Sequence, residues 1–286
     1  MRKLLYLIVL SGALALAGQA ELQQPRGAHR DGSETKTAKR LDVVKVVPHL
    51  AAASDWKSVL ILRNDLDRSI SLGLDLYGPD GLPASAVFYD SDDNQYESDR
   101  FDFTMAAFEV YTIEFDHMSD PGLVNLQAFL FSDENDQQYS VEAIFNNFQG
   151  PDKVATVGGG LQVPGDNFFM NIDERQDPYT LNPKLRGLAV TNAETQTCTC
   201  SVVLWSNLGG QTDVASVTIP PLAKWVGPAS ALVDTDALPN GLGVLDFDCD
   251  RQVGVTGLSF ETGTPIVGST PIDYYVFQNG KKQIRR

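Results

Sequence analysis

Three cysteines, all in the second half of the chain, have the residue type and spacing to do chemistry. Cys198 and Cys200 are two residues apart, so on a β-strand both side chains point to the same face. Cys249 has the same parity as the apolar residues Leu245 and Phe247, so we expect it to face inward as well. The favoured interpretation is a disulfide from Cys249 to either Cys198 or Cys200, which would add roughly 2 to 4 kcal/mol of stability. Three buried thiols are one alternative, and a metal site lacking its fourth ligand is the other.

A second candidate site is the acidic stretch Asp90-Ser-Asp-Asp-Asn94, in which oxygen-bearing side chains stand on alternate residues. Asp90, Asp92 and Asn94 match the first ligands of a calcium-binding loop. The later part of that pattern is missing, because Gln95 replaces the required Gly and Phe101 replaces the required Glu. Asp90, Asp92 and Asn94 therefore remain candidates for calcium, and a solvated loop is the alternative interpretation.

Sequence motifs of enzymatic catalysis are absent. The three histidines, His29, His49 and His117, stand apart, and neither His-x-His nor Gly-x-Ser-x-Gly occurs. Gly158-Gly-Gly160 precedes no helical pattern, so it does not predict a phosphate-binding loop. We predict no catalytic residues, no enzyme activity and no cofactor apart from the calcium considered above. A hydrolase that uses two carboxylates leaves no sequence signature, and it stays as the alternative.

The elements that position these residues are predicted to be β-strands, because no long stretch has helical periodicity. Ile70, Leu72, Leu74 and Leu76 alternate with polar or small residues, which places all four on one face of a strand. Phe101 to Ile113 predicts two short strands around a bend. Other strands are expected at 43–47, ending at Pro48, and at 56–62, 84–89, 123–131 and 139–145, the last two forming a hairpin. The stretch 90–100 is expected to be a polar loop.

The second half of the chain repeats landmarks of the first half in the same order. Leu60-Ile-Leu-Arg-Asn64 matches Leu188-Ala-Val-Thr-Asn192, and the turn at 77–81 matches the one at 205–209. Cys198 and Cys200 stand where the first half has Ile70 and Leu72, both expected in its core. The series predicts two copies of one all-β unit of sandwich size. Between them, 158–160 and 163–166 are expected to form a linker.

The two ends of the chain and its charge bear on location. Arg2 and Lys3 precede a short apolar run and then small residues up to Ala20, which predicts a signal peptide cleaved after residue 20. Two of the 22 Lys and Arg residues lie in it, so 20 remain against 37 Asp and Glu, a net charge of −17. Such a charge disfavours nucleic-acid binding, and no second run of membrane length follows.

These features together resemble secreted bacterial proteins of unknown function that carry tandem immunoglobulin-like β-sandwich repeats. The matching motifs are the Leu-x-Leu-x-Asn strand end at 60–64, the Asp-Gly turn at 77–81, the apolar-Pro-Pro bend at 219–222 and the Gly-x-Leu strand at 241–245. The resemblance covers about residues 42 to 275 and implies the fold. It implies no activity, because sandwich folds host unrelated functions.

The predicted organisation is a signal peptide (1–20), a disordered leader (21–40), a first β-sandwich (41–157) and a second β-sandwich with linker and basic tail (158–286). The predicted function is exported, non-enzymatic binding, adhesion or scaffolding in the periplasm or outside the cell. A protein or a glycan of the cell envelope is the expected partner, contacted through loops such as 90–100 and 133–136 or through a sheet edge. The alternative is a secreted carboxylate-based hydrolase acting on carbohydrate or cell-wall material.

Overall fold

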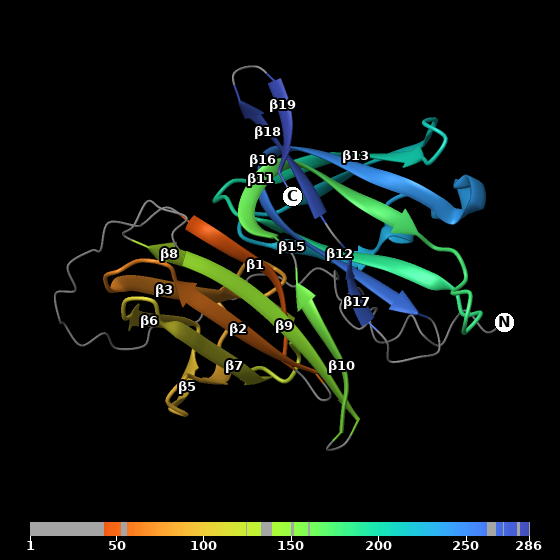
Figure 1. Ribbon diagram of the computed structural model, residues 1–286. Helices are drawn as coiled ribbons and strands as arrows, with labels where there is room; N and C mark the ends of the chain where they lie inside the picture. Colours follow the sequence, from red (N-terminus) through yellow and green to blue (C-terminus); the bar gives the residue numbers. More distant parts are fainter. Residues whose placement is uncertain are drawn as a thin grey trace, which may run out of the picture. The chain divides into compact units, whose positions relative to one another are not determined.

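The computed structural model describes residues 43–52, 56–123, 125–132, 139–149, 152–159, 161–261, 267–270, 272–278 and 281–285. Val43–Arg286 forms one compact unit. The described residues are all-β, since they form antiparallel strands and three short 3₁₀ turns but no α-helix (Figure 1). The predicted signal peptide and leader, and the predicted loop 133–136, lie outside the described residues.

The first half of this unit, residues 43–159, contains two antiparallel sheets. One has the strand order β1-β8-β3-β6, and the other has the order β10-β9-β2-β7-β4-β5. The strands are β1 (Val43–Ala51), β2 (Trp56–Asn64), β3 (Ile70–Tyr77), β4 (Ala86–Tyr89), β5 (Gln95–Ser98), β6 (Arg100–Met105), β7 (Val110–Met118), β8 (Asn125–Ser132), β9 (Tyr139–Gln149) and β10 (Asp152–Gly159).

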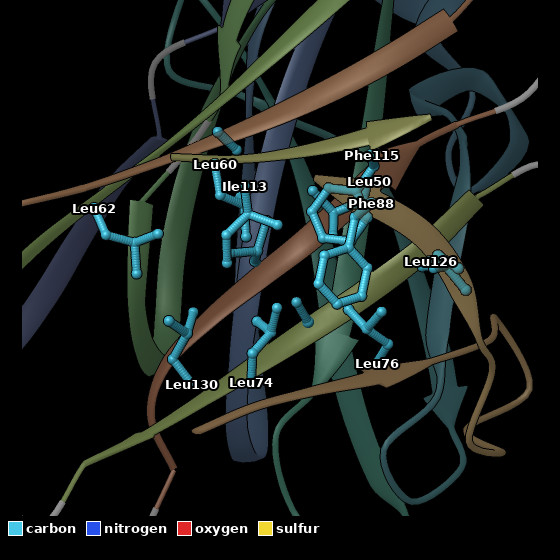
Figure 2. Packing of buried hydrophobic residues seen from close by; sticks show 14 of the residues in the cluster. Leu50, Leu60, Leu62, Leu74, Leu76, Phe88, Ile113, Phe115, Leu126 and Leu130 are labelled. Atoms are coloured by element: carbon cyan, nitrogen blue, oxygen red, sulfur yellow. The ribbon is translucent and has the colours of Figure 1, made fainter. Parts of the chain in front are cut away.

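Both sheets of the first half contribute to one hydrophobic core. Ile70, Leu72, Leu74 and Leu76 of β3 are buried as the period of two predicts, and Phe88 of β4 is buried within the same cluster. Figure 2 shows side chains from the two sheets meeting in this core. A core formed between two sheets is the arrangement of a β-sandwich, which confirms the predicted all-β, sandwich-like class for this part.

The second half, residues 161–285, is organised by β16 (Leu242–Glu261), a strand of 20 residues. Its first part pairs with β13 and β11, and its last part pairs with β12 and β17. The remaining elements are β11 (Leu161–Asp173), β12 (Lys184–Asn192), β13 (Cys198–Ser206), β14 (Gln211–Ile219), β15 (Lys224–Pro228), η1 (Ala229–Ala231), η2 (Thr235–Ala237), η3 (Pro239–Gly241), β17 (Val267–Thr270), β18 (Ile272–Gln278) and β19 (Lys281–Arg285). A second core lies here, with Phe168 stacked on Phe247 at 4.4 Å between ring centroids.

The strand orders of the two halves correspond. The order β1-β8-β3-β6 in the first half has the counterpart β11-β16-β13-β14 in the second. Likewise β9-β2-β7 has the counterpart β16-β12-β15. In the second half the single strand β16 therefore stands where the first half has two strands, β8 and β9.

Two buried asparagines end equivalent strands, β2 and β12, with the same hydrogen bonds. The side-chain amide of Asn64 donates to the carbonyl four residues later and to the carbonyl of Ala106, at 2.8 and 2.7 Å. Asn192 donates to the carbonyl four residues later and to that of Pro220, at 2.7 and 3.0 Å. Each Oδ1 also accepts the N–H two residues later, at 3.0 and 2.9 Å. Each asparagine thus holds the turn after its own strand against a distant bend.

Local patterns that were predicted to interrupt strands do not do so. Pro48 lies inside β1, where a register shift between Val47 and Leu50 and the edge position of β1 remove the need for its missing N–H. The predicted loop 90–100 contains β5, which pairs with β4. Of the residues predicted to form a linker, 158–159 and 163–166 lie in β10 and β11, and Gly160 lies outside the described residues.

The predicted hairpin of 123–131 and 139–145 is wrong as well. β8 pairs with β1 and β3 in one sheet, whereas β9 pairs with β2 and β10 in the other. The chain crosses between the sheets at this point, and strands that alternate in hydrophobicity look the same in sequence whichever sheet they join. The bend in 101–113 is confirmed, with β6 ending at Met105 and β7 beginning at Val110.

Candidate functional site

The calcium candidates lie in the turn between β4 and β5, and hydrogen bonds already occupy the Asp90 carboxylate. Its Oδ1 accepts the backbone N–H groups of Asp92 and Asn94, both at 2.9 Å. The Asn94 amide donates to both oxygens, and the Tyr96 hydroxyl donates to Oδ2 at 3.0 Å. Burial raises the pKa of Asp90, but these hydrogen bonds outweigh it and lower the pKa to about 2. A cation bound to Asp90 would have to displace these donors. Calcium binding by Asp90, Asp92 and Asn94 stays a prediction.

The three cysteines all face inward, as predicted. Cys200 on β13 and Cys249 on β16 are directly opposed and form a disulfide, with 4.0 Å between their Cα atoms. Cys198 is a buried free thiol, and its Sγ lies 3.8 Å from that of Cys200. Burial, followed by the charge of Asp250, raises the pKa of Cys198 to about 11. The open choice of disulfide partner is therefore resolved in favour of Cys200.

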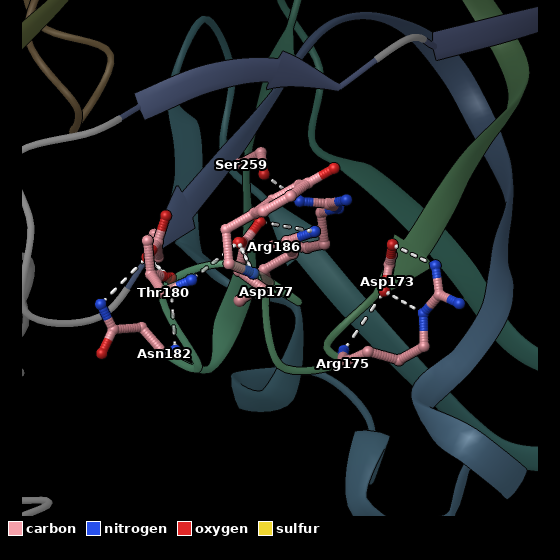
Figure 3. A network of polar contacts seen from close by, with 10 residues as sticks. Asp173, Arg175, Asp177, Thr180, Asn182, Arg186 and Ser259 are labelled. Atoms are coloured by element: carbon pink, nitrogen blue, oxygen red, sulfur yellow. Dashed lines mark hydrogen bonds and ion pairs between the residues drawn. The ribbon is translucent and has the colours of Figure 1, made fainter.

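A candidate site that the sequence did not indicate is the segment 174–183 between β11 and β12, here called the 174–183 loop (Figure 3). Asp177 organises it. One carboxylate oxygen accepts the N–H groups of Tyr179 and Thr180, at 2.9 and 3.2 Å. The other oxygen lies 3.3 Å from the ammonium group of Lys184. Because these bonds close a tight turn on one side chain, the loop is ordered from within.

A second set of bonds fastens the 174–183 loop to the sheet. Glu261, at the end of β16, accepts hydrogen bonds from the Thr180 hydroxyl and, at 3.0 Å, from the Asn182 side-chain amide. The backbone N–H of Lys184 donates to the carbonyl of Arg175 at 3.2 Å. The side chains of Asp177, Thr180 and Asn182 are thus bonded within the loop or to the end of β16.

The apolar side chains of this loop point the other way. Tyr179 is 93% exposed and Leu181 is 67% exposed. Leu181 has φ = 59°, in the left-handed region that side chains other than Gly, Asn and Asp rarely adopt. The loop is held by its own hydrogen bonds and presents a Tyr and a Leu to solvent, and exposed apolar groups of this kind are typical of contact surfaces.

The two carboxyl groups at the base of the loop, Asp173 and Glu174, have pKa values shifted in opposite directions. Hydrogen bonding to Arg175 lowers the pKa of Asp173, with nitrogen–oxygen distances of 2.9 and 3.0 Å. Burial raises the pKa of Glu174, and one oxygen of this carboxyl group accepts a hydrogen bond from the Thr235 hydroxyl at 2.7 Å. Arg186 donates to the Ser259 hydroxyl, and burial lowers its pKa. Adjacent carboxyl groups with opposite shifts are a feature of acid–base sites as well as of structural ones.

The two halves of the compact unit are joined by buried polar contacts. Lys224 of β15 is buried, and its ammonium group donates to the carbonyl of Leu126 at 2.6 Å. Its backbone N–H donates to the carbonyl of Pro79 at 3.0 Å. In the opposite direction, the side chain of Gln127 donates to the carbonyl of Leu222 at 2.8 Å. Burial lowers the pKa of Lys224 well below its usual value.

Comparisons of the chain with protein-family models, curated proteins and solved structures find no match. The resemblance to secreted bacterial proteins with immunoglobulin-like repeats therefore stays a prediction from the sequence. Among the described residues, no helix has the length and hydrophobicity needed to cross a lipid bilayer.

The signal that could have indicated the 174–183 loop is short. Asp177-Pro178 followed by Asn182-Pro183 is turn chemistry, because Asp and Asn side chains bond to nearby backbone groups and Pro fixes φ. The anchoring carboxylate of Glu261 lies about 80 residues away in the sequence, and no local pattern links it to the loop.

Proposed function

We propose that this protein is an exported, non-enzymatic binding or scaffolding protein of the cell envelope. It would consist of two tandem immunoglobulin-like sandwiches, copies of one unit, and would bind its partner through the 174–183 loop. Export rests on the predicted signal peptide at 1–20, which places the protein in the periplasm or outside the cell.

Conformational parallels between the halves support the duplication. Besides the strand orders and the two asparagines, Phe108 and Leu222 occupy equivalent bends with φ values of 59° and 57°. Gly81 and Gly209 occupy equivalent turns with φ values of 82° and 83°. Rare backbone conformations at matching positions argue for a common origin, since strand pairing alone would not require them.

The observation that carries the binding role is the exposure of Tyr179 and Leu181 on an internally bonded loop. Binding energy is lost when a loop must be ordered on association, and a loop already ordered avoids that loss. Exposed tyrosines are frequent energetic centres of interfaces, because a rigid ring contributes much contact area with few rotatable bonds. A protein partner with an apolar recess fits Tyr179 and Leu181 together, whereas a glycan would stack on the ring alone.

The alternative, a carboxylate-based hydrolase, has one observation in its favour. Asp173 and Glu174 are neighbours whose pKa values move in opposite directions, which is how acid and base roles are divided. Hydrolysis of cell-wall or other carbohydrate material that is lost in Glu174→Gln, while Tyr179→Ala retains it, would favour the enzyme over the binding protein.

The binding proposal is tested by quantitative capture of envelope components on the immobilised protein. We expect the double variant Tyr179→Ala/Leu181→Ala to lose a specific component that the wild type retains. Leu208→Ala is the matched control, since Leu208 is 75% exposed on a different turn and should leave capture unchanged. Equal loss in the control, or no change in the double variant, would exclude the loop as the contact surface.

A further inference from the structure

The sulfur atoms of the three cysteines lie close enough to act on a single centre. All three Sγ atoms lie within 4.8 Å of one another. Cys200 and Cys249 face each other across β13 and β16, and Cys198 is two residues from Cys200 on the same face. The disulfide and the third thiol therefore form one buried cluster, which the binding role proposed above does not use.

The composition of this cluster restricts what it can hold. Thiolates select soft, thiophilic centres over hard cations. The group of ligand atoms found among the described residues contains these three sulfurs, and the Asp250 carboxylate, which lies beside Cys198, is outside that group. A structural zinc site normally has four protein ligands. Three sulfurs therefore favour a centre whose usual coordination number is three.

Burial favours a neutral complex. The cysteines are buried among apolar side chains such as Val202, Ile219 and Phe247. Three thiolates with a monovalent ion carry two negative charges, and with a divalent ion they carry one. With a trivalent centre the complex is neutral, which avoids the cost of burying an uncompensated charge.

We propose that, after reduction of the disulfide, Cys198, Cys200 and Cys249 form a site for one trivalent thiophilic metalloid, with As(III) as its representative. A dithiol reductant first supplies two electrons and two protons, turning the Cys200–Cys249 bond into two thiols while the dithiol is oxidised to its own disulfide. Arsenous acid then exchanges its three hydroxyl groups for three sulfurs. The three thiol protons leave with the hydroxyls as three water molecules, and arsenic keeps its oxidation state.

The existing geometry needs limited adjustment for this step. As(III) keeps a lone pair, so three sulfur bonds of about 2.3 Å are arranged in a pyramid and place the sulfurs roughly 3.5 Å apart. The sulfurs of Cys198 and Cys200 lie 3.8 Å apart, within a few tenths of an ångström of that spacing. The disulfide and the arsenic site use the same sulfur atoms, so the oxidised protein cannot bind arsenic at this site. A dependence of binding on reductant therefore distinguishes this site from nonspecific binding at the surface.

The test is native mass spectrometry of the purified protein with sodium arsenite, before and after dithiol reduction. We expect the reduced protein to gain one arsenic with loss of three hydrogens, and the oxidised protein to gain none. Cys198→Ala keeps the disulfide and two thiols after reduction, so it controls for folding. Because Cys198→Ala has lost one of three tethered sulfur ligands, its affinity for arsenite should be weaker than that of the reduced wild type by at least about a hundredfold.

Three outcomes would overturn the proposal. The reduced wild type could bind no arsenic, or Cys198→Ala could bind it as tightly as the wild type. Equally tight binding by the urea-unfolded reduced chain would show that the fold does not form the site.

Discussion

Gly81 and Gly209 provide a matched pair of positions that tests how the first half contacts the second. Both lie in equivalent turns with nearly the same positive φ, 82° and 83°. A Cβ added at Gly209 would meet no heavy atom within 4 Å. A Cβ at Gly81 would lie 2.3 Å from the carbonyl oxygen of Pro221 and 2.9 Å from the backbone nitrogen of Ala223.

The magnitudes follow from these environments. Alanine in the left-handed region costs about 1 kcal/mol net, because the reduced entropy of the unfolded chain offsets part of the strain. Gly209→Ala should lower the free energy of unfolding by that amount. Gly81→Ala adds a clash with backbone atoms, which overpacking studies place at about 1 to 3 kcal/mol, so the total is roughly 2 to 4 kcal/mol.

The measurement is urea unfolding of the two alanine variants and the wild type under identical conditions. The difference between the variants isolates the contact between the halves, because the φ penalty is common to both. Equal destabilisation by the two substitutions, or a larger effect at Gly209, would refute the proposed packing of the turn at 77–81 against the bend at 219–222.

Three further predictions concern the disulfide and two ionisable groups. Cys200→Ala/Cys249→Ala should lower the free energy of unfolding by about 4 kcal/mol, because the disulfide closes a loop with a sequence separation of 49. Cys198→Ala removes only a buried thiol and should cost about 1 kcal/mol. Similar losses in the two variants would contradict the assigned pairing. Folding lowers the pKa of Lys224, so between that lowered pKa and the usual value of about 10.5 the unfolded chain binds more protons, and stability should rise with pH across this interval. Urea titrations at several pH values should show this slope reduced in Lys224→Met, and an unchanged slope would refute it. The pKa of Asp90 is lowered to about 2, so its contribution is present above about pH 4 and lost as the pH falls towards 2. Asp90→Asn should flatten this acid limb in the same titrations, and an identical limb in variant and wild type would count against the hydrogen bonds assigned to that carboxylate.

The fold was predictable wherever a local pattern determines the outcome. Alternation of apolar residues fixed the inward face of β3, and the same parity placed Cys198, Cys200 and Cys249 in the second core. The repeated Leu-x-x-x-Asn strand end correctly marked two residues, Asn64 and Asn192, which make the same hydrogen bonds.

The errors have a common physical cause, which is that pairing partners lie far apart in the sequence. The choice of sheet for β8 and β9 depends on contacts with β1, β2 and β3, and adjacent strands with a polar tip look like a hairpin locally. Glycine content suggested a linker at 158–160 and 163–166, although residues 158–159 pair with β9 and residues of β11 pair with β16.

The candidate site was missed for a related reason. Tyr179 and Leu181 look like ordinary loop residues, and their exposure depends on how Asp177 and the distant Glu261 hold the loop. Likewise, nothing in the sequence around Lys224 indicates that its side chain bonds to Leu126, about 100 residues away.

The central claim, that the 174–183 loop is the contact surface for a partner in the envelope, is tested most directly by photocrosslinking in the intact cell. A photoreactive phenylalanine derivative is placed at Tyr179, and in a parallel strain at Leu208 as the exposed control. We predict a discrete light-dependent adduct from position 179 and none from position 208. No adduct at position 179, or the same adduct from both positions, would contradict the claim.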